Sequence, residues 1–329
     1  MAGTRRPGEF EAIARWLAPL AAKAPGALGL VDDAAVLLPR PGQELVLTLD
    51  TMVSGVHFLA DDPPDLVARK LVRVNLSDLA AMGAEPAGCL LALTLTEAED
   101  AAWLEAFAAG LGADLEEFGL ALLGGDTAAT PGALTLSLTA LGWVPEGTAI
   151  RRSTAGAGED IWVTGTLGDA ALALALIEGR SAGRAIGEFP FLRERYRLPR
   201  PRTTVGPRLR GIATAMIDVS DGLAADLGHI CETSGLAAAV AFVALPLSGE
   251  ARALLDADAA LAHAVAAGGD DYELLFTAKP DDAARIAAVA EETGVPIARI
   301  GAMRAGSGAE IRGLDGRPMT LEATGWRHF

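Results

Sequence analysis

The apolar residues in the first half of the chain fall into alternating strand-like and helix-like runs. Unbroken or alternating apolar stretches predict strands at residues 34–38, 45–49, 90–95, 120–123 and 133–144. Apolar side chains that recur every three or four positions predict helices at residues 10–17, 64–82 and 103–118. Thr96 and Glu99 have the spacing of a capping box, so we expect them to open the third of these helices.

The second half continues the alternation. Strands are predicted at residues 161–164, 213–219, 237–242, 297–300 and 309–311, with a further one ending near Phe276. Helices are predicted at residues 170–177, 189–209, 223–233, 250–255 and 281–292. Both halves also contain candidate antiparallel hairpins, so the pattern predicts an α/β or α+β protein with two domains, residues 1–148 and 149–329. The Gly-, Arg- and Ser-rich loop 147–158 marks this boundary, or else reaches into a site.

Composition narrows the class of protein. A chain of 329 residues has room for two ordinary domains, and a hydrophobic content of 51% favours a folded globular chain. The formal net charge of −16 argues against a nucleic-acid partner. No uncharged run approaches the ~20 residues of a membrane span, and the N-terminus does not resemble a signal peptide, so we expect a soluble cytoplasmic protein with no membrane partner.

Cysteine, histidine and glycine motifs exclude several kinds of site. Cys89 and Cys231 are isolated and the histidines do not pair at metal-ligand spacing, so we expect two buried thiols and neither a disulfide framework nor structural zinc. The chain contains no P-loop sequence and no Gly-x-Gly-x-x-Gly run. Any nucleotide site is therefore of another kind.

Aspartates recur where apolar elements end. The apolar run that starts at Met216 ends in Asp218 and Asp221, although Ser220 or Asp221 could simply cap the helix that follows. Asp78 falls on the apolar face of the helix at 64–82, where a carboxylate is costly unless it is paired or bound to a metal. A buried aspartate held by an arginine and a metal ligand are both open at this stage.

Two glycine-rich stretches leave similar alternatives. Gly124–Thr127 could let a ligand approach the backbone closely, but it also suits a tight turn. Gly165–Asp169 could hold an anion at a helix N-terminus, but it reads more plainly as a strand, a turn and a helix. Neither stretch decides the function alone.

The acidic residues share one chemistry, because together they supply only oxygen ligands. The set comprises Asp32, Asp33, Asp50, Asp78, Asp126, Asp218 and Asp221, with Thr48 and Ser220 nearby. Oxygen ligands without His or Cys favour Mg²⁺, and so many carboxylates cannot converge without several cations. A polyphosphate nucleotide is the common ligand of such a site, so the residues predict a Mg²⁺-dependent, ATP-using protein.

The order of the motifs resembles the thiamine-monophosphate kinase family over nearly the whole chain. The first half carries Gly8-Glu9-Phe10, Asp32-Asp33-Ala34-Ala35, Asp50-Thr51, Gly55-Val56-His57-Phe58, Asn75–Ala84 and Gly124-Gly125-Asp126-Thr127. The second half carries Val163–Gly168, Ile217–Leu223, Gly269–Leu274 and the tail Gly325-Trp326-Arg327-His328-Phe329.

This resemblance implies a fold, a reaction and a set of site residues. The fold is that of aminoimidazole-ribonucleotide synthetase: an N-terminal domain that contributes strands to a dimeric β-barrel, a C-terminal α/β sandwich domain, and the site between them. The reaction is ATP plus thiamine phosphate giving ADP and thiamine diphosphate in a homodimer, with several Mg²⁺ ions. Implied metal ligands are Asp33, Thr48, Leu49, Asp50, Asp78, Asp126, Asp218 and Asp221. Implied ATP contacts are Gly125, Asp126, Arg152 and Ser220, and implied substrate contacts are His57, Asp270 and Trp326.

Three positions depart from the family pattern. Val31 stands where the family usually has glycine, Leu49 where it often has threonine, and Asp270 where it usually has glutamate. The first could displace the following acids slightly and the third shortens a substrate contact, but neither removes a carboxylate.

Alternative functions remain at this stage. Selenophosphate synthetases of the same fold require a reactive cysteine, or its substitute, in an N-terminal glycine-rich arm. Hydrogenase-maturation dehydratases require a C-terminal cysteine, and this chain has neither. Two alternatives stay open: an enzyme like aminoimidazole-ribonucleotide synthetase, or a non-catalytic protein that binds a nucleotide or thiamine phosphate.

Overall fold

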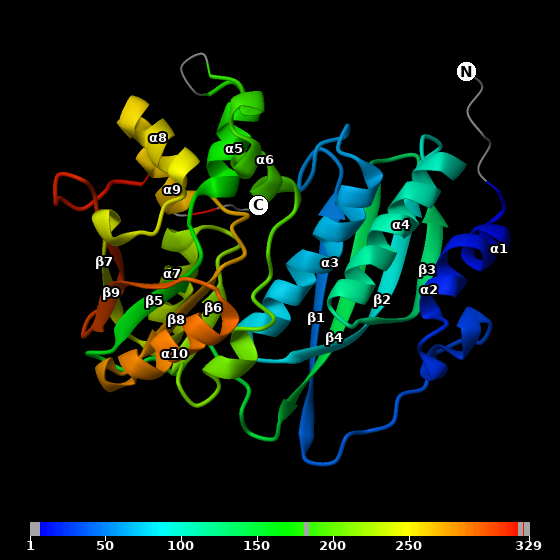
Figure 1. Cartoon of the computed structure of the whole chain (residues 1–329), viewed down its shortest axis with the longest axis horizontal. Helices are drawn as coiled ribbons and strands as arrows, with labels where there is room; N and C mark the ends of the chain where they lie inside the picture. The colour runs from blue at the N-terminus through cyan, green and yellow to red at the C-terminus, as the bar shows by residue number, and fades with distance from the viewer. Residues whose placement is uncertain (1–6, 181–183, 322–324, 326–329) are drawn as a thin grey trace. The chain divides into compact units, whose positions relative to one another are not determined.

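The structure is a computed structural model that describes residues 7–180, 184–321 and 325. The chain divides into two compact units (Figure 1). Unit 1 comprises residues 1–79 and 84–147, and unit 2 comprises residues 80–83 and 148–329. Each unit contains its own mixed sheet, which confirms the predicted α/β class with two domains.

Unit 1 is built on a four-stranded sheet in the order β1-β4-β2-β3. These strands are β1 Gln43–Val53, β4 Thr135–Pro145, β2 Glu85–Leu95 and β3 Ala121–Ala129. β4 is antiparallel to both of its neighbours, whereas β2 and β3 are parallel. In β1 the side chains alternate, so that Thr48, Asp50 and Met52 are at least partly buried while Leu47 and Leu49 are exposed. One face of β1 therefore carries Thr48 and Asp50, and the other carries exposed leucines.

Two long helices cover the face that carries Thr48 and Asp50. They are α3 Pro64–Ala81 and α4 Ala101–Glu117 (Figure 1). Hydrogen bonds from β1 to Asn75 and Asp78 place α3 on this face. Thr96 does bond Glu99 as a capping box would, but α4 begins later, at Ala101, because Asp100 accepts the backbone N–H of Trp103. The predicted start of this helix is therefore wrong, because the capping residue is Asp100 and not Thr96.

The N-terminal segment differs from the prediction in two places. The single helix expected at 10–17 is α1 Glu9–Ala12, a π-helix at Ile13–Leu17 and α2 Ala18–Ala21. The strand predicted at 34–38 is wrong, because this stretch follows a 3₁₀ segment, Pro25–Leu30, and runs as irregular chain. Its N–H at Val36 donates to the carbonyl of Gly26 instead of to a neighbouring strand.

The glycine stretch in unit 1 is a strand, not a turn. Gly124, Gly125 and Asp126 lie inside β3, where Gly125 is paired with Leu91 of β2. A Cβ atom at Gly125 would lie 1.9 Å from the carbonyl oxygen of Leu91. Close packing of two parallel strands therefore explains this glycine.

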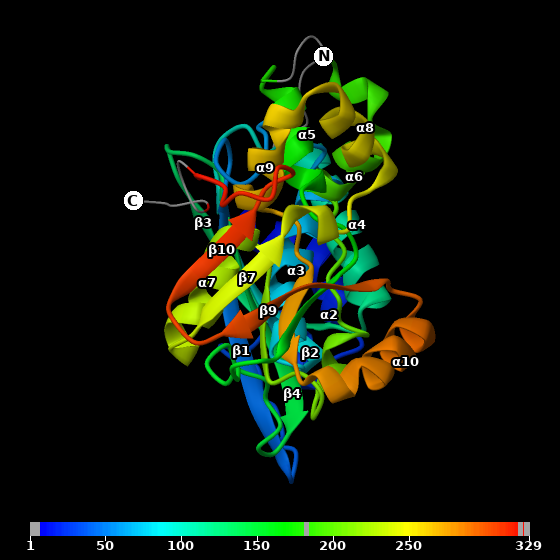
Figure 2. The ribbon, with the colours of Figure 1, turned by 90° about the vertical axis from the view of Figure 1, so that its left-hand side faces the viewer.

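Unit 2 is built on a six-stranded sheet in the order β10-β7-β9-β5-β8-β6. Its strands are β5 Asp160–Thr164, β6 Ala215–Asp218, β7 Ala237–Ala241, β8 Leu274–Ala278, β9 Ile297–Arg304 and β10 Gly308–Arg312. Figure 2 shows β10, β7 and β9 side by side. Among the pairs that the described residues form in this sheet, only the β10–β7 pair is parallel.

Helices surround this sheet. They are α5 Asp169–Ile177, α6 Pro190–Arg197, α7 Leu223–Ser234, α8 Gly249–Ala257, α9 Ala262–Ala267 and α10 Ala283–Thr293. Short 3₁₀ turns lie at Ile186–Glu188, Gly206–Leu209, Phe242–Ala244, Ala259–Leu261 and Pro280–Asp282. One buried cluster packs Met216 and Phe276 of the sheet against Ile286 of α10. The region predicted as helix at 189–209 is helical only at its two ends.

Among the helices of the described residues, none has both the length and the apolar character needed to cross a bilayer.

A buried ion pair joins α3 to α4. The carboxylate of Asp114 is fully buried and accepts hydrogen bonds from Arg73 Nε at 2.6 Å and Arg69 Nε at 2.7 Å. Removing one partner of such a pair leaves a charge in the interior, which costs more than the pair itself contributes.

We predict that Asp114→Asn lowers the free energy of unfolding by about 3–5 kcal/mol, the usual cost of breaking a buried ion pair. Urea denaturation of the purified protein measures this loss. Glu116→Gln is the control on the same helix, because its partner Lys23 is exposed, and it should change stability by less than about 0.5 kcal/mol. Equal effects of the two substitutions would contradict the prediction.

Candidate functional site

In unit 1, the middle of β1 and the C-terminal part of α3 bring four polar residues together. Thr48 Oγ1 donates to Asp78 Oδ2 at 2.5 Å. The backbone N–H of Asp50 donates to Asn75 Oδ1 at 3.1 Å, and Asn75 Nδ2 donates to the carbonyl of Leu71. The helical period that placed Asn75 and Asp78 on the inner face of α3 is therefore confirmed. This group provides the hard oxygen atoms that Mg²⁺ prefers.

The electrostatics of this group favour a cation. Burial, and then the charge of Asp78, raise the pKa of Asp50 to about 7. A carboxyl with so high a pKa shows that the surrounding protein compensates its negative charge poorly. A bound divalent cation would provide that compensation.

The other predicted ligands of unit 1 do not join this pair of acids. Asp126 lies on β3, three strands away from Asp50 on β1, a separation of about 14 Å at the usual strand spacing. Strand registers place Asp126 in line with Thr51 rather than with Asp50, so the two carboxylates leave the sheet on opposite faces. Asp33 is exposed in the irregular segment after residue 30.

Two further candidates of unit 1 have defined surroundings. Leu49 points its exposed side chain to the face opposite Thr48 and Asp50, so only its backbone carbonyl could bind a cation. His57 lies in the turn after β1, where its Nδ1 accepts the backbone N–H of Val53 at 3.0 Å and its carbonyl accepts from Lys70. This bond leaves the other ring nitrogen of His57 to carry the proton.

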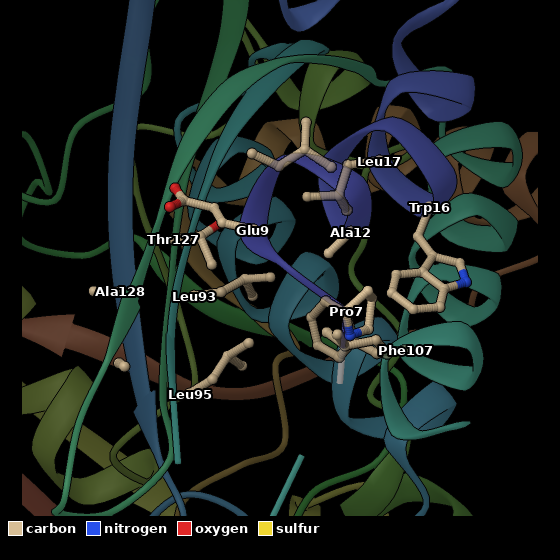
Figure 3. A pocket seen from close by; sticks show the side chains of 13 residues that line it. Pro7, Glu9, Ala12, Trp16, Leu17, Leu93, Leu95, Phe107, Thr127 and Ala128 are labelled. Carbon is tan, nitrogen blue, oxygen red and sulfur yellow. The ribbon is translucent and has the colours of Figure 1, made fainter. Parts of the chain in front are cut away.

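A cavity of about 200 Å³ in unit 1 lies away from Asp50 and Asp78. It lies between the N-terminal helices and strands β2 and β3, with Trp16 and Phe107 among its walls (Figure 3). Its lining is mostly apolar, with Glu9 and Thr127 as polar members. Such a lining does not suit a polyphosphate.

In unit 2, Asp218 ends strand β6, and the loop from β6 to α7 carries Ser220 and Asp221. The backbone of this loop is bonded to the segment that enters β8: Asp270 N–H donates to the carbonyl of Ser220 and Tyr272 N–H to that of Val219, each at 2.8 Å. These bonds fix the position of the loop, and Asp218 at the end of β6 is buried.

The alternative that Ser220 or Asp221 simply caps the helix does not hold. The N-cap of α7 is Gly222, at φ +120°, and neither Ser220 nor Asp221 caps the helix. Instead Asp226, one turn inside the helix, accepts the N–H groups of Asp221 and Gly222 at 3.2 and 3.0 Å. Ser220 and Asp221 are therefore not used as caps, which leaves their side-chain oxygens available for other ligands.

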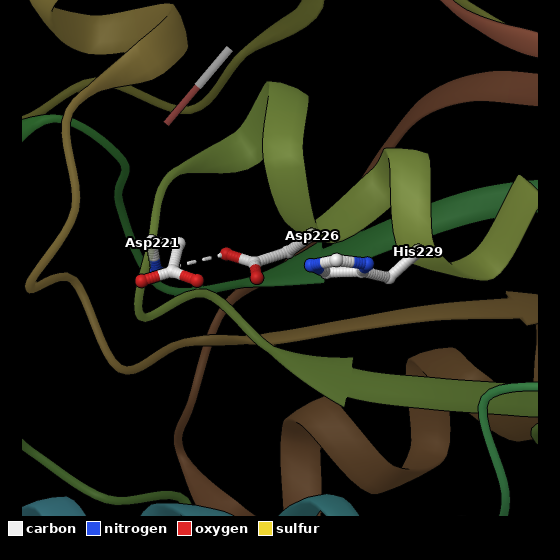
Figure 4. A group of neighbouring side chains, drawn as sticks. All are labelled: Asp221, Asp226 and His229. Atoms are coloured by element: carbon white, nitrogen blue, oxygen red, sulfur yellow. Dashed lines mark hydrogen bonds between the residues drawn. The ribbon is translucent and has the colours of Figure 1, made fainter. Parts of the chain in front are cut away.

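Asp221, Asp226 and His229 form a cluster whose ligand atoms lie within 4.8 Å of one another (Figure 4). Burial, and then the charge of Asp221, raise the pKa of Asp226 to about 7. Neither Asp226 nor His229 was predicted from the sequence as a site residue. Their three-residue spacing on one helix face was the available signal.

The segment Gly269–Glu273 places alternate side chains in opposite environments. Asp271 and Glu273 are buried, while Asp270 and Tyr272 are partly exposed. Glu273 binds Arg195 at 2.9 Å, and burial raises the pKa of Asp271 well above its usual range. Of the substrate contacts that the resemblance implies, only Asp270 lies here.

The turn Gly165–Asp169 is not an anion site. The N–H of Gly168 donates to Asp271 Oδ2 at 2.7 Å, and the carboxylate of Asp169 accepts from Thr166 and Ser248. The N–H group of Gly168 is therefore already bonded to the buried carboxylate of Asp271. The interpretation as a strand, a turn and a helix is confirmed.

The remaining two candidates lie at the edges of what the structure describes. Arg152 has an exposed side chain, and its carbonyl accepts from Thr233 at the end of α7. Trp326 lies outside the described residues. Its neighbour Gly325 lies against the loop between β6 and α7, since a Cβ atom at Gly325 would be 2.8 Å from the carbonyl oxygen of Asp221.

Comparisons with known proteins identify the family of the chain. The family model described as AIR synthase related protein, N-terminal domain, matches residues 31–144, and the model of the C-terminal domain of the same family matches residues 156–313. The chain is 44% identical over 325 residues to the thiamine-monophosphate kinase of Caulobacter vibrioides, covering 98% of this chain and 91% of that protein.

Two solved structures are also similar. The thiamine-monophosphate kinase of Stenotrophomonas maltophilia is 46% identical, with a TM-score of 0.84 over 95% of this chain and 98% of the other. The structure described as AaThiL complexed with AMPPCP and TMP is 29% identical, with a TM-score of 0.76 over 98% of this chain and 97% of the other.

We predict that Asp50→Asn removes part of the pH dependence of stability in metal-free protein. The pKa of Asp50 in the folded state, about 7, lies above that of an unfolded aspartate, so the wild type loses stability as pH rises from about 4 to 7. Urea denaturation in EDTA across this range should show a smaller loss for Asp50→Asn. Asp61→Asn, at an exposed position in the same unit, should behave as wild type. A variant curve parallel to that of the wild type would refute this role of Asp50.

Proposed function

The chain belongs to the thiamine-monophosphate kinase family, and we propose that it transfers the γ-phosphoryl group of ATP to thiamine phosphate. The products are ADP and thiamine diphosphate. The observation that carries this proposal is 44% identity to such a kinase over 98% of the chain. The related structure with AMPPCP and TMP supports the same pair of substrates. These relatives are thiamine-monophosphate kinases. The alternative of an enzyme like aminoimidazole-ribonucleotide synthetase is therefore not favoured.

The residues present fit Mg²⁺ as the accompanying cation. In unit 1 the ligands are Thr48, Asp50 and Asp78, whose oxygens are already gathered, and in unit 2 they are Asp218 and Asp221. The raised pKa of Asp50 is the sign of a carboxylate that lacks a counter-charge. Bound Mg²⁺ would neutralise phosphate charge and align the transferred group.

The remaining family positions complete the proposed site. The full set of metal ligands is Asp33, Thr48, Leu49, Asp50, Asp78, Asp126, Asp218 and Asp221. Gly125, Asp126, Arg152 and Ser220 would contact ATP, and His57, Asp270 and Trp326 the thiamine phosphate. The strand separation of Asp126 and Asp50 means that, within one chain, these two acids serve different ions or different parts of the ligand.

The protein needs no general base for this reaction. The accepting group is a phosphate oxygen, which is already anionic at neutral pH. The obstacle is repulsion between two anions, so the side chains act by holding both substrates in line and by fixing the cations between them. Transfer is then direct, without a phosphorylated enzyme.

A second copy of the chain would cover the exposed face of the unit 1 sheet. Leu45, Leu47 and Leu49 of β1 and Leu90 of β2 are 40–60% exposed on this face. Exposed leucines side by side on a sheet are costly in water and typical of an interface. We therefore propose a homodimer in which this face is buried, consistent with the dimeric barrel of the family.

Free, buried Cys89 and Cys231 fit a reducing, cytoplasmic location.

The homodimer is tested by Leu47→Lys, which we expect to shift the protein from dimer to monomer in sedimentation velocity. A charge buried in an apolar interface costs several kcal/mol. Leu314→Lys is the control, because Leu314 is as exposed as Leu47 but lies in unit 2. A wild type that sediments as a monomer at working concentration would refute the dimer.

The reaction is tested by ADP release with ATP, Mg²⁺ and thiamine phosphate. We expect turnover that requires all three, and Asp78→Asn and Asp221→Asn should each lower kcat at least about 100-fold by weakening cation binding. Asp258→Asn is the control, since Asp258 caps a short turn elsewhere in unit 2. Tight binding of both substrates without turnover would instead support the binding protein, and full activity of Asp78→Asn would exclude the proposed metal role.

A further inference from the structure

A buried aspartate inside α7 is bonded to the backbone of the loop that carries Ser220 and Asp221. One carboxylate oxygen of Asp226, Oδ2, accepts the N–H groups of Asp221 and Gly222 at 3.2 and 3.0 Å. The backbone N–H of Asp226 donates in turn to the carbonyl of Gly222 at 3.0 Å. Asp226 is 2% exposed, so water competes little for these bonds. The loop and the first turn of α7 are therefore joined in both directions.

The start of the loop is held from another direction, by β8 and the segment before it. The N–H of Val219 donates to the carbonyl of Glu273, and the carbonyl of Val219 accepts from Tyr272, each at 2.8 Å. The carbonyl of Ser220 accepts from Asp270 at the same distance. These bonds reach as far as Ser220, and the bonds to the carboxylate inside α7 follow at the next two residues.

Gly222 is the point of the loop that most needs a restraint. It has a φ of +120°, and a Cβ atom on it would lie 2.7 Å from the carbonyl oxygen of Ala267. A glycine adopts such a backbone without strain, but it also has the widest choice of other conformations. A fixed acceptor selects one of them. Asp226 therefore supplies the restraint directly beside Asp221.

The side chain of Asp221 is partly exposed and lies among unfavourable neighbours. The ligand atoms of Asp221, Asp226 and His229 all lie within 4.8 Å of one another (Figure 4). Two charged carboxylates at this distance repel each other, so a mobile Asp221 would turn away from Asp226. The bonds from Asp226 to the backbone hold Asp221 in place in spite of this repulsion.

We propose that Asp226 is a positioning residue, which orients Asp221 as a cation ligand through two backbone N–H groups and does not bind the cation itself. This inference rests on the proposed function, in which Asp221 holds Mg²⁺. Removing a group that orients a metal ligand typically lowers metal affinity or activity about 10- to 100-fold. The two hydrogen bonds require an oxygen acceptor at position 226 but not a negative charge, and this requirement separates positioning from direct binding.

The test compares Asp226→Ala with Asp226→Asn, because asparagine keeps one oxygen acceptor and alanine keeps none. Hydrogen exchange of metal-free protein, followed by mass spectrometry, should be at least about 10-fold faster at residues 221 and 222 in Asp226→Ala. The Mg²⁺ concentration that gives half the maximal rate of ADP release should rise about 10- to 100-fold in this variant. In Asp226→Asn we expect both quantities to stay within about threefold of wild type.

Asp100→Ala is the control for a general loss of stability. Asp100 accepts the N–H of Trp103 at the start of α4, so its loss removes a comparable bond in unit 1. We expect it to lower the midpoint of urea denaturation and to leave exchange at residues 221 and 222 and the Mg²⁺ dependence unchanged. Should Asp226→Ala not fold, Asp226→Asn still decides, because a cation ligand does not tolerate the loss of its charge.

Three results would overturn the inference. They are equal losses in Asp226→Ala and Asp226→Asn, which would make Asp226 a ligand, unchanged exchange in Asp226→Ala, and unchanged Mg²⁺ dependence in Asp226→Ala while Asp221→Asn is impaired. Full activity of Asp221→Asn would instead overturn the proposed metal role of Asp221, and the inference with it. Wild type that releases no ADP would overturn the proposed reaction, whereas the exchange measurement still decides whether Asp226 holds the loop.

Discussion

A carboxylate removed from water must find a donor or a cation, and the structure answers this requirement in two ways. Asp114 and Glu273 are fully buried and are bonded to arginines of the same unit. Their charges are compensated within the protein, so they hold helices and strands together. Such pairs contribute little net stability, but each is expensive to break, which makes both positions intolerant of change.

Asp50 and Asp226 answer the requirement differently. Each has a pKa of about 7, because burial and a neighbouring aspartate both favour the protonated form. Asp226 satisfies one oxygen with backbone N–H groups, and Asp50 lies beside the Thr48–Asp78 bond. Perturbed acids of this kind mark functional sites more often than structural ones. The contrast with Asp114 separates, within one chain, acids whose charge arginines compensate from acids whose charge the described surroundings compensate poorly.

The spacing of apolar residues along the chain predicted most helices and strands. It also indicated one of the two groups of acids, the one around Asp78. The helical spacing of Asn75 and Asp78 placed both on the inner face of α3, since a helix face depends only on local sequence. Strand order and register depend on distant segments, so the separation of Asp126 from Asp50 could not be read from the chain. The apolar run at 34–38 was read as a strand for the same reason, because a run of apolar residues does not reveal whether a partner strand exists.

The loop between β6 and α7 shows that contacts of single side chains are also hard to predict from the sequence. Sequence spacing made Ser220 or Asp221 a reasonable cap for α7, yet Asp226 reaches back from inside the helix and takes the N–H groups instead. Caps are competitive: whichever acceptor lies closest to the exposed N–H groups takes them, and that depends on the turn at Gly222. Because Asp226 fills this role, the oxygens of Asp221 are not consumed by the fold.

Asp270 illustrates how a departure from a family pattern can follow from backbone geometry. The family usually has glutamate at this position, but here the residue has a φ of +70°. Aspartate enters the left-handed region more readily than glutamate, since its short side chain can bond locally. The shorter side chain reaches less far towards a ligand, and the bond from Tyr272 limits its freedom to swing away. The backbone conformation at position 270 therefore gives a local reason for aspartate that does not depend on any ligand.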